Sequence, residues 1–208
     1  MTPTPLTAEG VLADIGYDGF VRALFSRSGD LSKDFAHAAL GMVTEIHELR
    51  CATDPVNLIE EASDLLFFMT ALVQVVADLP DMNAEIEGWG CEKFDAEFSA
   101  LLAAQIGTTD QYVDHLCNTL LDHAKRWVGY GKAPENLHGV MAVGGTLVQL
   151  ALQSVNIDFE ADEGIITLVN VKKLLQRYKG LTFNAQNAIN RDTGAERVVL
   201  EAALASAN

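Results

Sequence analysis

Apolar positions recur along this chain at helical rather than strand spacing. Proline occurs at only five positions, so long segments can run without a helix breaker. No segment alternates apolar and polar residues with a period of two, which argues against a substantial sheet. Helices are predicted over residues 30 or 32 to 49, 55–78, 92–105, 108 or 109 to 126, 134–155 and 164–178, with a loop at 129–136. The pattern therefore predicts an all-α fold, with a single domain over residues 1–208.

Four acidic residues lie in two pairs on the first two predicted helices. Glu45 and Glu48 are three residues apart, as are Glu61 and Asp64, and residues at that spacing share a helix face. If the two helices pack antiparallel, both pairs point into one space, where four carboxylates repel each other. A divalent cation with oxygen ligands relieves that repulsion. A solvated charged face is the simple alternative, but the apolar run at 65–77 is untypical of a solvated helix.

Composition and charge narrow the classes of partner. The formal net charge of −15 argues against binding to a nucleic-acid backbone. It does not exclude nucleotides, because a metal ion can mask the negative charge locally. The N-terminal segment lacks a signal-peptide pattern, and the apolar run at 65–77 is too short to span a bilayer. Free thiols in a reducing compartment are expected from three cysteines without C-x-x-C spacing, so we expect a cytoplasmic protein.

The segment that begins at Pro134 is similar to the segment that begins at Pro55. This likeness predicts a degenerate duplication, with an acidic pseudo-repeat over residues 33–105 and a second one over residues 110–180. At the same offset the four acidic positions correspond to Ala124, Trp127, Val140 and Val143. One metal site per chain would follow, with the second copy as a wall. Helical hairpins also resemble each other merely because their apolar patterns are alike.

The two acidic motifs, in this order and followed by an apolar helix, resemble those of the MazG-like all-α nucleoside triphosphate pyrophosphohydrolases. That superfamily also includes dimeric dUTPases, dCTP pyrophosphatases and phosphoribosyl-ATP pyrophosphohydrolases. A downstream stretch, NVKKLLQRYKGLTFNAQNAINRD, is similar to a segment that many members carry. Its matching residues are Asn170, Lys173, Leu174, Arg177, Tyr178, Asn190, Arg191 and Asp192. The two likenesses cover residues 34–78 and 170–192.

The resemblance implies a helical bundle that hydrolyses a nucleoside triphosphate, with a deoxynucleotide favoured, to the monophosphate and pyrophosphate. It implies Mg²⁺, which Mn²⁺ could replace, held by the four acidic residues. It also implies a homodimer. Many members carry an additional Glu just before the first acid, as a candidate general base, but this chain has Thr44 there. Glu48 is our first choice for the catalytic base, and Glu60 is a further candidate.

The downstream stretch suggests how substrate would be held. Asn170, Lys173 and Arg177 follow helical spacing and would share one face. Lys173 suits a point contact to a phosphate, and Arg177 suits a bidentate one. Solvated basic residues or structural ion pairs are the alternatives. His37 would share a face with Glu48 and could contact the base or sugar, with Gly41 leaving room for a ligand. His37 could equally be a partly buried polar residue.

Two other classes of function remain open. The first is a non-catalytic nucleotide-binding or scaffold protein of the same fold. The second is a carboxylate-bridged di-iron bundle, which wants two E-x-x-H motifs together with two further Glu residues. This chain has one such motif, from Glu135 to His138. The di-iron hypothesis is therefore the weaker of the two.

Overall fold

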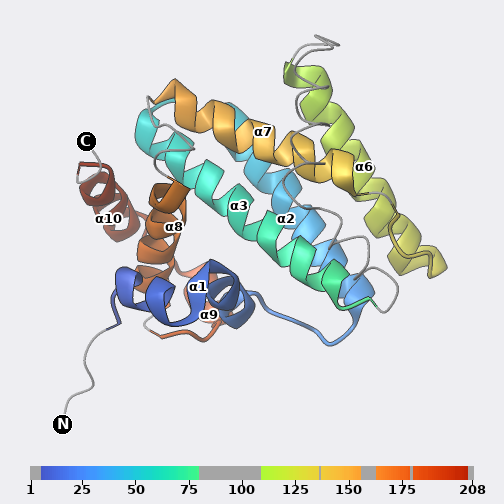
Figure 1. Cartoon of the computed structure of the whole chain (residues 1–208), viewed down its shortest axis with the longest axis horizontal. Coiled ribbons are helices and arrows are strands. Elements are labelled where there is room, and N and C mark those ends of the chain that lie inside the picture. Colours follow the sequence, from blue (N-terminus) through green and yellow to red (C-terminus); the bar gives the residue numbers. More distant parts are fainter. Residues whose placement is uncertain (1–5, 80–108, 136, 156–162, 179, 206–208) are drawn as a thin grey trace.

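The computed structural model describes residues 6–79, 109–155 except 136, 163–178 and 180–205, and all regular secondary structure in these residues is helical. The predicted all-α class is confirmed for these residues. The segment 92–105, for which a helix is predicted, lies outside them. The helices are α1 (Ala8–Leu24), α2 (Leu31–Cys51), α3 (Pro55–Ala77), α6 (Thr109–Tyr130), α7 (His138–Ser154), α8 (Glu163–Arg177), α9 (Ala185–Ile189) and α10 (Thr193–Ala205) (Figure 1).

Helices α2 and α3 form an antiparallel hairpin, which Figure 1 shows in blue and green. Asp30 caps α2 by accepting hydrogen bonds from the backbone of Ser32 and Lys33. Asp54 caps α3 in the same way, and Pro55 occupies the first turn of α3, where its missing N–H costs nothing. Only three residues separate the helices, so their acid-bearing faces are held close together.

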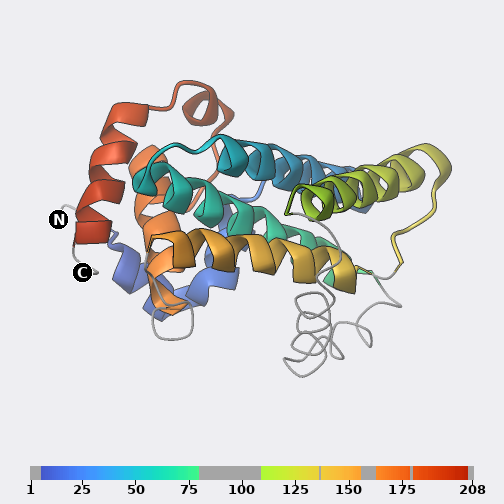
Figure 2. The same ribbon diagram turned by 90° about the horizontal axis from the view of Figure 1, so that it is seen from above.

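Helices α6 and α7 pack along the other side of this hairpin, α6 against α2 and α7 against α3 (Figure 2). The four residues that correspond to the acids of the first hairpin, Ala124, Trp127, Val140 and Val143, are all buried in the core. The ring of Trp127 lies 5.3 Å from that of Phe35 on α2, between ring centres. The α6–α7 pair thus forms an apolar wall, while its origin by duplication stays a prediction.

The remaining helices gather at one end of the four long helices (Figures 1 and 2). Helix α8 packs against α3, α1 and α10. Helix α1 has no prediction from the sequence because it contains Gly10, Gly16 and Gly19, and glycine disfavours helix interiors. Gly16 has a φ of 66° and a ψ of 176°, so α1 is kinked there. Helices α9 and α10 also have no prediction, because α9 has only five residues and both helices expose an apolar residue, Ile189 or Val198, which weakens a one-sided apolar pattern.

Two predicted boundaries are each wrong by four residues, about one helical turn. Helix α6 continues to Tyr130 rather than ending at Arg126, so part of the predicted loop is helical. Gly131, with a φ of 67°, follows α6 in a conformation that favours glycine. Helix α7 begins at His138 instead of Pro134, so this proline lies in the connection between the helices and not in a first turn.

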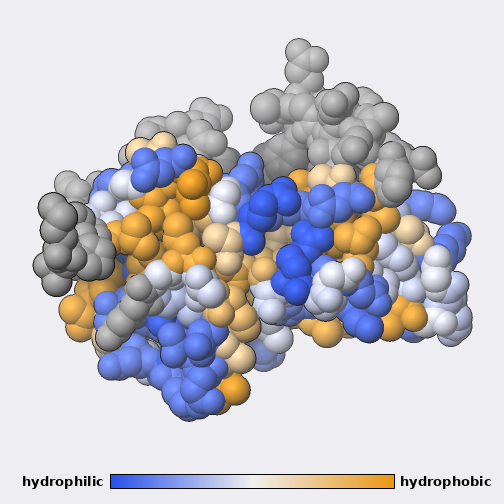
Figure 3. All heavy atoms as spheres, turned by 90° about the horizontal axis from the view of Figure 1, so that it is seen from below, coloured by the Kyte–Doolittle hydropathy of each residue, from blue (hydrophilic) through white to orange (hydrophobic). Residues whose placement is uncertain are grey.

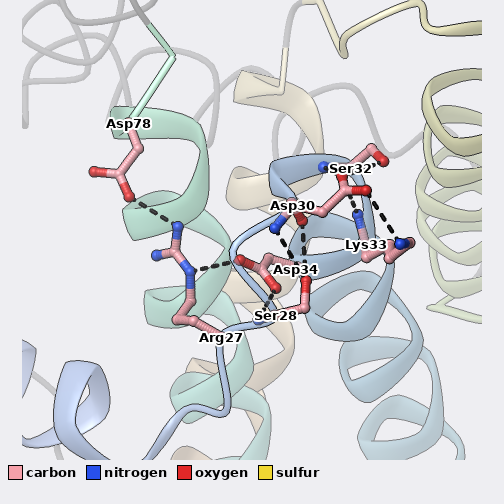
Figure 4. Close-up of polar contacts among 7 residues, drawn as sticks. All are labelled: Arg27, Ser28, Asp30, Ser32, Lys33, Asp34 and Asp78. Atoms are coloured by element: carbon pink, nitrogen blue, oxygen red, sulfur yellow. Dashed lines mark hydrogen bonds and ion pairs between the residues drawn. The ribbon is translucent and has the colours of Figure 1, made fainter.

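The loop between α1 and α2 is fastened to both helices of the hairpin (Figure 4). Arg27 donates hydrogen bonds to Asp34 on α2 and to Asp78 after α3, each at 2.8 Å. Asp34 is only 1% exposed and also accepts a bond from the backbone N–H of Ser28. Burial alone would raise the pKa of Asp34, but these hydrogen bonds and the guanidinium charge lower it. The connection therefore fixes how α1 enters the fold.

The surface carries both apolar and polar patches. In Figure 3 apolar patches lie beside hydrophilic ones on the face that is seen from below. Leu6 and Ile15 belong to the exposed apolar residues, and Asn190 and Arg191 to the exposed polar ones. None of the helices in the described ranges has both the length and the apolar content that a membrane crossing needs.

Candidate metal centre and adjoining pocket

Three carboxylates converge between α2 and α3, and we call Glu45, Glu61 and Asp64 the acidic cluster. Each offers one oxygen, and these oxygens all lie within 4.8 Å of one another. The antiparallel hairpin brings Glu45 on one helix level with both acids on the other. Hard oxygen donors at this separation suit a divalent cation. The acidic cluster could therefore hold a metal ion.

Glu48, the fourth predicted ligand, lies outside this group. It is exposed on α2, whereas the three residues of the acidic cluster are partly buried. Glu48 lies three positions after Glu45. Because 3.6 residues make a turn, its side chain is rotated by about 60° around the helix axis relative to that of Glu45. Glu48 is still near enough for its charge to raise the pKa values of Glu45 and Glu61. Its predicted roles as a ligand and as the catalytic base stay predictions.

The acidic cluster resists full ionisation. Burial, followed by the charges of Asp64, Glu48 and Glu61, raises the pKa of Glu45 to about 9. Burial, followed by the charges of Asp64 and Glu60, raises the pKa of Glu61 to about 7. Both groups thus retain protons near neutral pH in the metal-free protein, and a bound cation would have to displace these protons.

Asn170 and Lys173 on α8 reach this cluster from a distant part of the sequence. Both side chains are fully buried, with 0% exposure. Asn170 donates a 2.9 Å hydrogen bond to Asp64, and the ammonium group of Lys173 donates to the other Asp64 oxygen. The same ammonium lies 3.6 Å from a carboxylate oxygen of Glu60. The predicted face of α8 is therefore real, and in this structure its polar groups contact acids.

Arg177, one turn further along α8, forms a bidentate ion pair. Its guanidinium group donates to both oxygens of Glu196 on α10, at 2.8 and 2.7 Å. Glu196 is only 2% exposed. Burial alone would lower the pKa of Arg177, but the bonds to Glu196 raise it. Glu196 could not be found from the sequence, because no regular spacing relates it to Arg177. The two residues meet only because α10 packs against α8.

A pocket of about 270 Å³ opens beside the acidic cluster, and we call it the aromatic pocket. Glu45 and Asp64 form part of its wall, and Arg177 and Arg191 form another part. The remaining lining residues are mostly apolar or aromatic, and they include Leu24, Phe25, His37, Phe67, Phe68, Leu174, Tyr178 and Phe183. One cavity thus combines carboxylates, guanidinium groups and flat apolar surfaces.

His37 is exposed and belongs to this pocket. Its ring stacks on Phe25 with a centre separation of 4.7 Å and an interplanar angle of 21°. Gly41 has a different purpose from the one predicted. A Cβ atom there would come within 2.3 Å of the Phe68 ring, so the missing side chain makes room for Phe68 and not for a ligand.

The raised pKa values predict that the stability of the metal-free protein depends on pH. Glu45 and Glu61 have higher proton affinity folded than unfolded, so the folded state binds more protons between pH 4.5 and the folded pKa values of about 9 and 7. Stability should therefore fall as pH rises through this window. Because a tenfold change in proton affinity is worth about 1.4 kcal/mol, we expect a loss above that value between pH 5 and 9.

Urea unfolding in the presence of a chelator would measure this loss. Mg²⁺ should remove most of it at high pH, since a cation replaces the protons. A Glu45→Gln variant serves as the control and should show a flatter profile than the wild type. A metal-free wild type whose stability rises from pH 5 to 9 would contradict the prediction.

Comparison with known proteins finds no family model, no curated protein and no solved structure that matches this chain. The likeness to MazG-like enzymes therefore depends on the sequence motifs. The contacts of the acidic cluster and the aromatic pocket are the structural basis for a proposal of function.

Proposed function

We propose that this protein is a Mg²⁺-dependent nucleoside triphosphate pyrophosphohydrolase of MazG-like type. The observation that carries the proposal is the aromatic pocket, whose lining combines two members of the acidic cluster and two arginines with apolar and aromatic side chains. A homodimer, as the sequence resemblance implies, is part of the same proposal.

The lining of the pocket fits the parts of a nucleotide. Flat rings such as Phe25 and His37 suit the faces of a base. Arg191 is exposed, and within the described ranges no ion pair engages it, so its guanidinium group can face a phosphate. The carboxylates alone would repel a triphosphate, and a divalent cation between them reverses that repulsion.

The residues of the acidic cluster would hold the cation. When bound, Mg²⁺ supplies charge neutralisation for the phosphates and activation of water for attack. Asn170 and Lys173 each donate to one oxygen of the Asp64 carboxylate, so its orientation is set before substrate enters. Glu48 and Glu60 lie at the margin of the cluster, where either carboxylate could accept a proton from water.

A screen of common and modified nucleoside triphosphates tests the proposal directly. We expect at least one of them to yield its monophosphate and pyrophosphate in the presence of Mg²⁺. Pyrophosphate and orthophosphate should be quantified separately, and a chelator provides the control. Release of orthophosphate alone, or no turnover of any nucleotide, would refute the proposed reaction.

A non-catalytic nucleotide-binding protein is the second candidate. The observation that favours it is the direct bond of Lys173 to Asp64, which already satisfies one carboxylate oxygen without a metal. Nucleotide binding by calorimetry without turnover in the same screen would support it. The di-iron hypothesis has no such observation, because the candidate metal cluster found among the described residues contains no histidine.

A further inference from the structure

Tyr17 follows the kink in α1 and is partly buried against the core. The conformation of Gly16, with φ of 66° and ψ of 176°, belongs to a region that is essentially restricted to glycine. Tyr17 follows directly, and its hydroxyl donates a 3.0 Å hydrogen bond to the side-chain oxygen of Asn170. Burial, and then the charge of Asp64, raises the pKa of Tyr17 well above its usual value, so the hydroxyl keeps its proton.

The Asn170 side chain has all its hydrogen-bonding groups satisfied in one orientation. Its NH₂ group donates to Asp64 at 2.9 Å and to the hydroxyl oxygen of Ser63 at 3.4 Å. The Ser63 hydroxyl donates its own hydrogen to the backbone oxygen of Glu60, so its oxygen is free to accept. The carboxylate of Asp64, which is ion-paired with Lys173, can likewise only accept a hydrogen bond. The amide oxygen of Asn170 must therefore face Tyr17.

We propose that Tyr17 is a positioning residue for the acidic cluster. Its hydroxyl holds the amide oxygen of Asn170, and the NH₂ group of that amide holds the carboxylate of Asp64 for cation binding. The effect on hydrolysis rests on the proposed function, whereas the hydrogen-bonded chain from Tyr17 to Asp64 does not.

Loss of the Tyr17 hydroxyl would leave the Asn170 oxygen buried without a donor. The amide then keeps two of its three described hydrogen bonds, those to Ser63 and Asp64, and is held less firmly against the Asp64 carboxylate. Partners of this kind, one step removed from a metal, are typically worth 10- to 100-fold in metal affinity or activity. The hydrogen bonds from Tyr17 through Asn170 to Asp64 thus link the kinked helix α1 to a carboxylate on α3.

Tyr17→Phe removes the hydroxyl and keeps the ring. We expect Mn²⁺ affinity, measured without nucleotide, to fall roughly 10- to 100-fold. The side-chain NH₂ signals of Asn170 in ¹H–¹⁵N spectra should lose their protection from hydrogen exchange. Tyr130→Phe is the matched control, because Tyr130 is 76% exposed and lies outside the site.

A double-mutant cycle separates positioning from general loss of stability. In an Asn170→Ala background, Tyr17→Phe should cause no further loss of Mn²⁺ affinity, because the amide that the hydroxyl holds is already gone. Phe20→Leu, at a fully buried α1 residue beside Tyr17, should lower the melting temperature and leave Mn²⁺ affinity unchanged. This variant controls for simple loosening of α1.

Unchanged Asn170 signals in Tyr17→Phe, or additive losses in the double variant, would overturn the proposal. If the wild type itself binds no Mn²⁺, the proposed function fails. The Asn170 signals would then still decide whether Tyr17 orients the amide, so the two failures are distinguishable.

Discussion

Glu61→Gln is expected to abolish Mg²⁺-dependent hydrolysis, with a loss of more than about 100-fold, because outer partners of a metal alone are worth 10- to 100-fold. The substitution removes one negative oxygen from the acidic cluster and changes the shape of the side chain very little. The metal-free variant should be at least as stable as the wild type at pH 8. Burial and neighbouring acids raise the pKa of Glu61 to about 7, so its carboxylate is charged unfavourably at that pH.

Initial rates over a range of Mg²⁺ concentrations, together with melting temperatures in a chelator, would check both parts. Glu201→Gln makes the same chemical change at an exposed position on α10, where Glu201 is ion-paired to Arg197, and should leave the rate unchanged. Wild-type turnover in Glu61→Gln would place the site elsewhere.

Lys173→Met is expected to lower the stability of the metal-free protein by about 3–5 kcal/mol, the usual cost of removing one partner of a buried ion pair. Lys173 is fully buried, and its ammonium group contacts Asp64 and lies 3.6 Å from Glu60. Methionine fills a similar volume without the charge, so the acids are left uncompensated. Mg²⁺ should restore more stability to this variant than to the wild type.

Urea unfolding with a chelator and with Mg²⁺ would measure these differences. Lys172→Met provides the matched control. This neighbour pairs with Glu9 near the surface, and exposed pairs contribute about 0–1 kcal/mol. If Lys173 contacts phosphate instead, Lys173→Met would weaken nucleotide binding and hardly destabilise the metal-free protein.

The acid-bearing hairpin could be predicted because its signals are local. Pro55 begins α3, Asp30 caps α2, and spacing of three places Glu61 and Asp64 on one face. The position of Glu48 could not be predicted, because its exposure depends on the rotation of α2 against its neighbours. The membership of three acids in the cluster, rather than four, follows from that rotation.

The partners of the basic residues depend on contacts across the whole chain. Spacing predicts that Asn170, Lys173 and Arg177 share a face of α8, and the structure shows what this face meets. Glu196 pairs with Arg177 only because α10 docks on α8. The role of Tyr17 could not be predicted from the sequence either. The three glycines of α1 weaken the helix signal, and the direction of the Tyr17 side chain depends on the kink at Gly16.

The buried ammonium of Lys173 makes the acidic hairpin dependent on the C-terminal part of the chain. Asp64 and Lys173 are 109 positions apart, so the countercharge is synthesised after both acid-bearing helices. A chain truncated before α8 would keep Glu45, Glu61 and Asp64 and lose the described lysine that is ion-paired to Asp64. Such a fragment would carry an uncompensated negative charge at the acidic cluster. Divalent cations from solution would then supply the positive charge that Lys173 supplies in the whole chain.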